Sequence, residues 1–109
     1  SSHEMYQLSE IYLMRGENPL PVFQKAYEQF PEDVVVTLNY ANALLKYGKK
    51  ADGALRVLSD VRNDSRALFP MAVAYHIKGD WRKAEELLKE AYKQGDDRAR
   101  AFYGEDAYE

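Results

Sequence analysis

A pattern that occurs three times along the chain limits what this sequence can fold into. In each copy, a large apolar residue stands eight positions before a glycine, a small residue seven before it and a large apolar residue four before it. The copies are Leu8-Ser9-x-x-Tyr12-x-x-x-Gly16, Tyr40-Ala41-x-x-Leu44-x-x-x-Gly48 and Met71-Ala72-x-x-Tyr75-x-x-x-Gly79. The glycines are 32 and then 31 residues apart. A period of this length, held across most of the chain, indicates a repeat array.

The spacing inside the pattern is helical. Residues three and four apart share one face of a helix, so the apolar and small residues form one buried stripe. Each glycine stands where a helix ends, in a backbone conformation that other residues adopt at higher cost. A second amphipathic stretch follows, and in the third copy it runs from Asp80 to Tyr92 with Ala84, Leu88 and Ala91 on one face. The repeating unit is therefore helix, short turn, helix.

We expect an all-α protein on this basis. The predicted helices are 4–15, 19–30, 33–47, 50–62, 67–78 and 80–94, with a short final helix at 97–103. One short stretch favours a strand by its composition, namely Val34-Val35-Val36-Thr37. It leads directly into residues with helical spacing, so we predict a helix there. Pro70 would kink a helix that began at Ser65, so we place that helix start near Ala67.

The helices are expected to form one domain of three units, at 4–31, 33–64 and 65–95. About three units are the usual minimum for independent stability. The last unit would leave an apolar face bare, and we expect Ala99, Phe102 and Tyr103 to cover it as a short capping helix within 96–109. The acidic end of that segment is predicted to be a frayed tail, and residues 1–3 are interpreted as a cloning remnant.

These units resemble the tetratricopeptide repeat (TPR) family. The three glycine patterns carry the resemblance, together with Ala84, Ala91 and Asp80 in the third unit, and it covers about residues 4–95. The second unit departs from the family where Gly53 and Asp60 replace the usual alanines. The resemblance implies a right-handed superhelical solenoid. In that family the first helices of successive units line a concave surface that holds an extended peptide or a helix.

Composition excludes several classes of partner. Fifteen basic residues against eighteen acidic ones give a net charge of −3 and a pI near 5.4, which is unlike a nucleic-acid-binding domain. No apolar run is long enough to cross a bilayer, so we expect no membrane insertion. Cysteine is absent, which excludes disulfides and thiolate chemistry but leaves the compartment open, with the cytoplasm favoured.

The sequence offers no catalytic, cofactor or metal site, and we expect the chain not to be an enzyme. His3 and His76 are its only histidines, and neither has a partner at a spacing that suits proton transfer or zinc binding. Residues 48–53 have the outline of a phosphate-binding loop but lack the following Lys-Ser/Thr and lie between two predicted helices. His76 is interpreted as a surface or packing residue.

The resemblance also assigns groove residues by position. They are Tyr6, Glu10 and Leu13 in the first unit, Leu38, Asn39, Asn42 and Leu45 in the second, and Arg66, Phe69 and Val73 in the third. The core stripes already hold enough apolar residues, so Leu38, Leu45, Phe69 and Val73 cannot all be needed there and should leave an apolar strip. The family's clamp for chaperone C-termini is not expected, because only Asn39 and Arg66 suit it and Glu10 would repel a carboxylate.

The expected function is a non-catalytic protein–protein interaction module, a scaffold or adaptor for complex assembly. Its groove would bind a peptide or an amphipathic helix of a partner protein. The alternative is a structural segment of a larger TPR protein or a self-association domain, in which the strip is a domain or subunit contact. A third hypothesis is that an enzyme lies elsewhere in a longer parent chain and that the present domain positions its substrate.

Overall fold

The computed structural model describes residues 2–103, and all regular structure within them is helical. The elements are α1 (Ser2–Met14), α2 (Leu20–Gln29), α3 (Val34–Tyr47), α4 (Ala51–Ser59), the 3₁₀ helix η1 (Ser65–Ala67), α5 (Leu68–Ile77), α6 (Trp81–Lys93) and α7 (Asp97–Tyr103). The prediction of an all-α protein is confirmed. Each helix begins and ends within three residues of its expected bounds, and the largest difference is at α4, where turns replace the last predicted residues.

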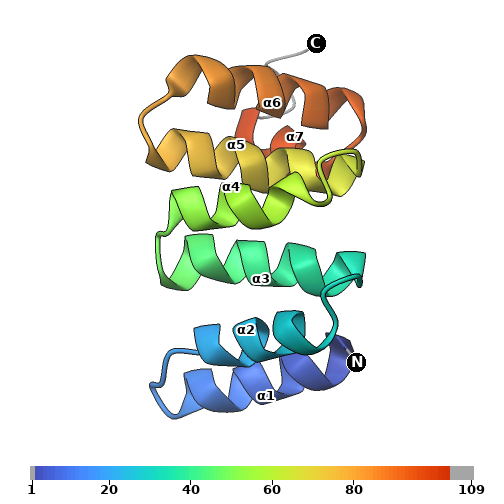
Figure 1. Cartoon of the computed structure of the whole chain (residues 1–109). Helices are drawn as coiled ribbons and strands as arrows, with labels where there is room; N and C mark the ends of the chain where they lie inside the picture. The colour runs from blue at the N-terminus through green and yellow to red at the C-terminus, as the bar shows by residue number, and fades with distance from the viewer. Residues whose placement is uncertain (1, 104–109) are drawn as a thin grey trace.

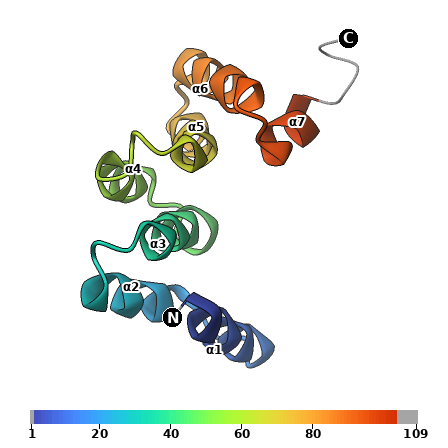
Figure 2. The ribbon, with the colours of Figure 1, turned by 90° about the vertical axis from the view of Figure 1, so that its right-hand side faces the viewer.

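The helices form an elongated stack, 41 × 28 × 25 Å along its principal axes. Successive helices run in opposite directions, with α1 at one end of the stack and α6 and α7 at the other (Figure 1). Seen along the helices, α1, α3 and α5 lie toward one side, α2 and α4 toward the other, and α7 lies beside α5 on the side of α1 and α3 (Figure 2). Each helix packs mainly on its neighbours in sequence, as expected of a repeat-like architecture.

Aspartates fix where several helices start. Asp33 accepts a hydrogen bond from the Val36 backbone N–H at 3.1 Å, and Asp80 accepts one from the Lys83 N–H at 3.2 Å. Each satisfies a donor that the first helical turn leaves without a partner. Pro70 lies in the first turn of α5, where its missing N–H costs nothing, so the predicted late start of this helix is confirmed.

All three glycines stand where a first helix ends, as predicted, and two of them have the predicted left-handed backbone. Gly16 and Gly79 have φ values of +71° and +83°. Gly48 does not, since its φ is −119° and the left-handed position falls instead on Lys49, at +49°. The expected backbone conformation is therefore wrong for Gly48, although α3 does end there. Here α3 closes with a longer turn, in which the Lys50 N–H donates to the Leu44 carbonyl six residues back.

Three apolar clusters make up the core, one between α1, α2 and α3, one between α3, α4 and α5, and one between α5, α6 and α7. Small side chains are fully buried where helices cross, including Ala41, Ala72 and Ala84. Ala99 on α7 is buried against Ala72, Leu88 and Ala91, so a short helix does cover this end. The side chains of Phe102 and Tyr103 and the acidic tail 104–109 lie outside the described residues, as does Ser1.

Candidate functional site

The outward sides of α3 and α5 carry two small hollows. The first, the Asn39 hollow, has a volume of about 190 Å³ and is lined by Tyr6, Phe23, Asn39, Asn42, Ala43, Lys46 and Tyr47. The second, the Phe69 hollow, has a volume of about 230 Å³ and is lined by Phe69, Ala72, Val73, His76 and Leu88. The first is partly polar and the second is almost entirely apolar. Five of the ten sequence-predicted groove residues line one or the other.

The Asn39 hollow contains an incompletely satisfied buried amide. Asn39 is 8% exposed, and its Oδ1 accepts a hydrogen bond from the Tyr6 hydroxyl at 2.6 Å. Its Nδ2 is buried and has no hydrogen-bond partner within the described part of the chain. Tyr6 is itself held edge-on against Phe23, with ring centroids 6.1 Å apart. A buried amide donor left in this state costs free energy.

The rim of this hollow is polar and basic. Asn42 and Lys46 lie three and seven residues after Asn39 on α3, which places them on the same side of that helix. The Lys46 ammonium lies 5.4 Å from the centroid of the Tyr47 ring, another lining residue. A carbonyl or carboxylate oxygen would therefore meet the Asn42 amide and the positive charge of Lys46 here.

The Phe69 hollow is bordered by two aromatic contacts. The Arg98 guanidinium, at the start of α7, lies 4.7 Å from the centroid of the Phe69 ring. The His76 ring meets the largely exposed Trp81 ring edge-on, at 4.5 Å between centroids. The sequence analysis did not single out Arg98 or Trp81 for this surface. Neither residue could be assigned to the hollow from the sequence, because each stands at the start of its own helix and comes near the hollow only through packing between helices.

Leu38 and Leu45 do not belong to either hollow. Both are buried, at 8% and 6% exposure, in the cluster that α3 forms with α4 and α5. The expectation of an apolar strip running over all four apolar positions is therefore wrong. Because α3 is covered by α4 and by α5, these two leucines close the core, and only Phe69 and Val73 remain partly open.

The remaining predicted groove residues lie apart. Glu10 and Leu13 are exposed on α1 and line neither hollow. Arg66 lies on η1, where its guanidinium pairs with Asp64 at 2.8 Å and faces Gln94 and Arg98 across a shallow depression. The hydrogen bonds from Arg66 hold the pKa of Asp64 well below its usual value, at about 2. Arg66 therefore stabilises the turn that precedes α5 in this structure.

The part of the chain that the structure describes contains neither a cluster of metal ligands nor a membrane-spanning helix. No three His, Asp or Glu side chains among residues 2–103 gather to hold a metal ion. No helix within that range is long and apolar enough to cross a membrane. Comparison with models of known protein families, with curated proteins and with solved structures gave no match. The functional argument therefore rests on the fold and the two hollows.

Proposed function

We propose that this chain is a non-catalytic protein-interaction module that binds a peptide segment of a partner protein along the side formed by α1, α3 and α5. In this proposal the three helix pairs are TPR-like units that form a right-handed superhelical solenoid, and α7 covers the last of them. The observation that carries the proposal is the pair of small open hollows beside α3 and α5, one almost entirely apolar and one with Asn42 and Lys46 among its lining residues.

The size of the hollows supports a peptide rather than a small-molecule substrate. Pockets for small molecules usually enclose roughly 300–1,000 Å³. The two hollows, at about 190 and 230 Å³, are each closer to the volume that one or two side chains fill. A single segment with an apolar side chain and a nearby oxygen acceptor would suit the Phe69 hollow and the Asn39 hollow together.

The nature of the two hollows defines the ligand further. The Phe69 hollow offers apolar contacts from Phe69, Val73 and Leu88, which suit the apolar face of an amphipathic helix or one anchor of an extended peptide. The Asn39 hollow adds Lys46 at its rim, which favours an acidic or carbonyl-rich stretch. We therefore propose a ligand segment with an apolar anchor flanked by an acidic residue.

The proposal is tested by selecting binders from a displayed library of random peptides and measuring their affinity for surface variants. Lys46→Glu and His76→Glu each alter one hollow at an exposed position, and Lys83→Glu on α6 is the matched control that lines neither. We expect the dissociation constant to rise at least about tenfold for the two hollow variants and to stay unchanged for the control. Circular dichroism verifies that all three are folded.

Two results would contradict the proposal. One is a selection that yields no peptide binder. The other is a set of peptides that bind all three variants as tightly as the wild type, because the ligand surface would then lie elsewhere.

A further inference from the structure

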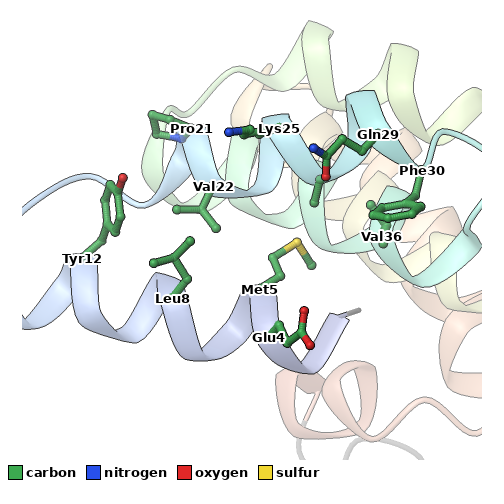
Figure 3. Close-up of a pocket in the computed structure, with 11 residues that line it drawn as sticks. Glu4, Met5, Leu8, Tyr12, Pro21, Val22, Lys25, Gln29, Phe30 and Val36 are labelled. Atoms are coloured by element: carbon green, nitrogen blue, oxygen red, sulfur yellow. The ribbon is translucent and has the colours of Figure 1, made fainter.

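A groove lined mostly by apolar residues, with Glu4 and Lys25 among them, lies on the first helix pair, at the end of the stack away from α7. It lies between α1 and α2 and has a volume of about 450 Å³. Figure 3 shows Met5 and Leu8 of α1 facing Val22 of α2, with Lys25 on the α2 side and Glu4 on the α1 side. This groove is separate from the two hollows of the proposed peptide site.

Helix α1 leaves much of its apolar surface uncovered beside this groove. Leu8 and Ile11 are both 46% exposed, and Phe30, at the far end of the groove, is half-exposed. The repeat pattern placed Leu8 in the core, but Leu8 borders this open groove and stays half-exposed, whereas Met5 and Ser9 are buried. Contiguous apolar exposure of this kind on a small domain indicates an interaction surface.

The residues along this edge of α1 have a self-complementary order. Glu4, Leu8, Ile11 and Arg15 follow one another at spacings of four, three and four, so they lie along one side of the helix. Arg15 still follows the helical path, because its N–H donates to the Ile11 carbonyl at 3.2 Å. The spacing is the same in both directions, and its two ends carry opposite charges.

This order of residues along α1 favours a second copy of the same helix, in antiparallel orientation, as the partner that covers this surface. Antiparallel pairing places Leu8 of one chain against Ile11 of the other, in the manner of an antiparallel coiled-coil seam. The same register sets Glu4 opposite Arg15 at both ends. Parallel pairing would instead set Glu4 against Glu4 and Arg15 against Arg15, which like charges disfavour.

We propose that two copies of this chain associate through the outer face of the first helix pair, with their α1 helices antiparallel and each lying along the other's α1–α2 groove. The arrangement is a closed twofold dimer, in which the same surface is used on both chains. Helix α1 is only about 20 Å long, so the buried area falls toward the small end of specific interfaces. We therefore expect a dissociation constant in the micromolar range.

The association is measured by sedimentation equilibrium from low micromolar to about millimolar concentration. Ile11→Glu and Leu13→Glu form a matched pair, because both residues lie on α1 and are 46% and 47% exposed, but Leu13 lies on the opposite edge. Ile11→Glu is expected to raise the dimer dissociation constant at least about tenfold, and Leu13→Glu to leave it unchanged. Circular dichroism confirms that both variants are folded.

An exchange of charges tests the antiparallel register. Arg15→Glu places two carboxylates opposite each other at each end and should weaken the dimer. The double variant Glu4→Arg/Arg15→Glu exchanges the charges and should restore it. A chain that remains monomeric throughout, a dimer that Leu13→Glu weakens as much as Ile11→Glu, or a double variant that fails to recover would each overturn the proposal. None of these outcomes bears on peptide binding at the Asn39 and Phe69 hollows, so the two proposals fail separately.

Discussion

Small side chains at the helix crossings set how closely the helices of this protein can approach. Ala72 is almost fully buried where α5 meets α6 and α7, beside Leu88, Ala91 and Ala99. A larger side chain at this position must displace one of these neighbours or extend into the Phe69 hollow, which Ala72 lines. The repeat pattern predicted this role, because it placed a small residue at the same position of every unit.

Replacing Ala72 by leucine should therefore destabilise the fold. The added methyl groups force the α5–α6 crossing apart, and we expect a loss of about 1–3 kcal/mol in the free energy of unfolding. Denaturant unfolding followed by circular dichroism measures it. Ala101→Leu, at an exposed position of α7, is the control and should change stability little. Equal effects at both positions would contradict the packing argument.

The hydrogen bond between Tyr6 and Asn39 joins α1 to α3 across the Asn39 hollow. Tyr6→Phe removes the hydrogen bond to the Oδ1 of a buried amide whose Nδ2 has no partner in the described part of the chain, and we expect a loss of about 1–2 kcal/mol. Adding Asn39→Leu removes the unsatisfied amide as well and should recover most of that loss. A double-mutant cycle by denaturant unfolding measures the coupling between the two residues. Strict additivity would show that the hydrogen bond contributes nothing.

At the scale of the helices, the residues at the helix ends determine where the chain turns. The Gly79 backbone is left-handed and an added Cβ would meet nothing within 4 Å, so Gly79→Ala isolates the cost of backbone strain. Lys49 adopts the same kind of backbone without being glycine. We expect Gly79→Ala to lower the free energy of unfolding and Lys49→Gly to raise it, each by about 0.5–1 kcal/mol. Thermal unfolding compares the two, and a change of the same sign in both would contradict the assignment.

The aspartate that opens η1 gives this protein an acid-sensitive helix start. Asp64 accepts hydrogen bonds from the side chain and backbone of Arg66, which lower its pKa from 3.8 to about 2. A carboxyl group whose pKa is lower in the folded state stabilises that state above its unfolded pKa, and the contribution is lost as the pH falls toward the folded value. The window therefore lies between about pH 4 and pH 2.

We expect Asp64→Ala to cost about 1 kcal/mol at pH 5, as the loss of a helix cap usually does. The difference in stability between wild type and variant should shrink as the pH falls through this window. Urea unfolding at successive pH values measures it. A difference that stays constant down to pH 2 would mean that the ionised carboxylate does not support this turn.

A second sequence repeat marks the starts of helices and was missed in the sequence analysis. Asp64-Ser65-Arg66-Ala67 and Asp96-Asp97-Arg98-Ala99 stand 32 residues apart. In both, the aspartate accepts bonds from the arginine side chain and backbone, and the alanine is fully buried. Burial raises the pKa of Asp96, but the bonds from Arg98 outweigh it and lower the pKa overall. Helix α7 therefore begins as the segment before α5 does.

The helices and their bounds could be predicted because they depend on local signals. Helical spacing, the N-terminal aspartates and the position of Pro70 all act within one or two turns of the chain. The failures arose where a residue's surroundings depend on how the helices pack against one another. Leu38 and Leu45 are covered by both α4 and α5, and Leu8 is left half-exposed because it borders the open groove between α1 and α2. A single sequence does not specify which side of a helix its neighbours cover.

For the whole molecule, stability should be uneven because contacts run mainly between neighbouring helices. Helix α3 buries eight of its 14 residues, whereas α1 packs mainly on α2 and leaves Leu8, Ile11 and Leu13 half-exposed. Regions with few buried contacts open at lower free energy than the centre of a repeat stack. Native-state hydrogen exchange should therefore find weaker amide protection in α1 than in α3, at concentrations where the chain is monomeric. Equal protection along the stack would indicate that it unfolds as one cooperative unit.

The proposed dimer adds a dependence on concentration that packing within one chain cannot produce. A partner that binds only the folded α1 stabilises it in proportion to the logarithm of its concentration above the dissociation constant. Amide protection in α1 should therefore rise about tenfold when the protein concentration is tenfold above that constant, while protection in α7, at the other end of the stack, stays unchanged. Ile11→Glu should abolish the rise. If α1 remained equally protected at every concentration, its apolar edge would have to be covered by something other than a second copy of this chain.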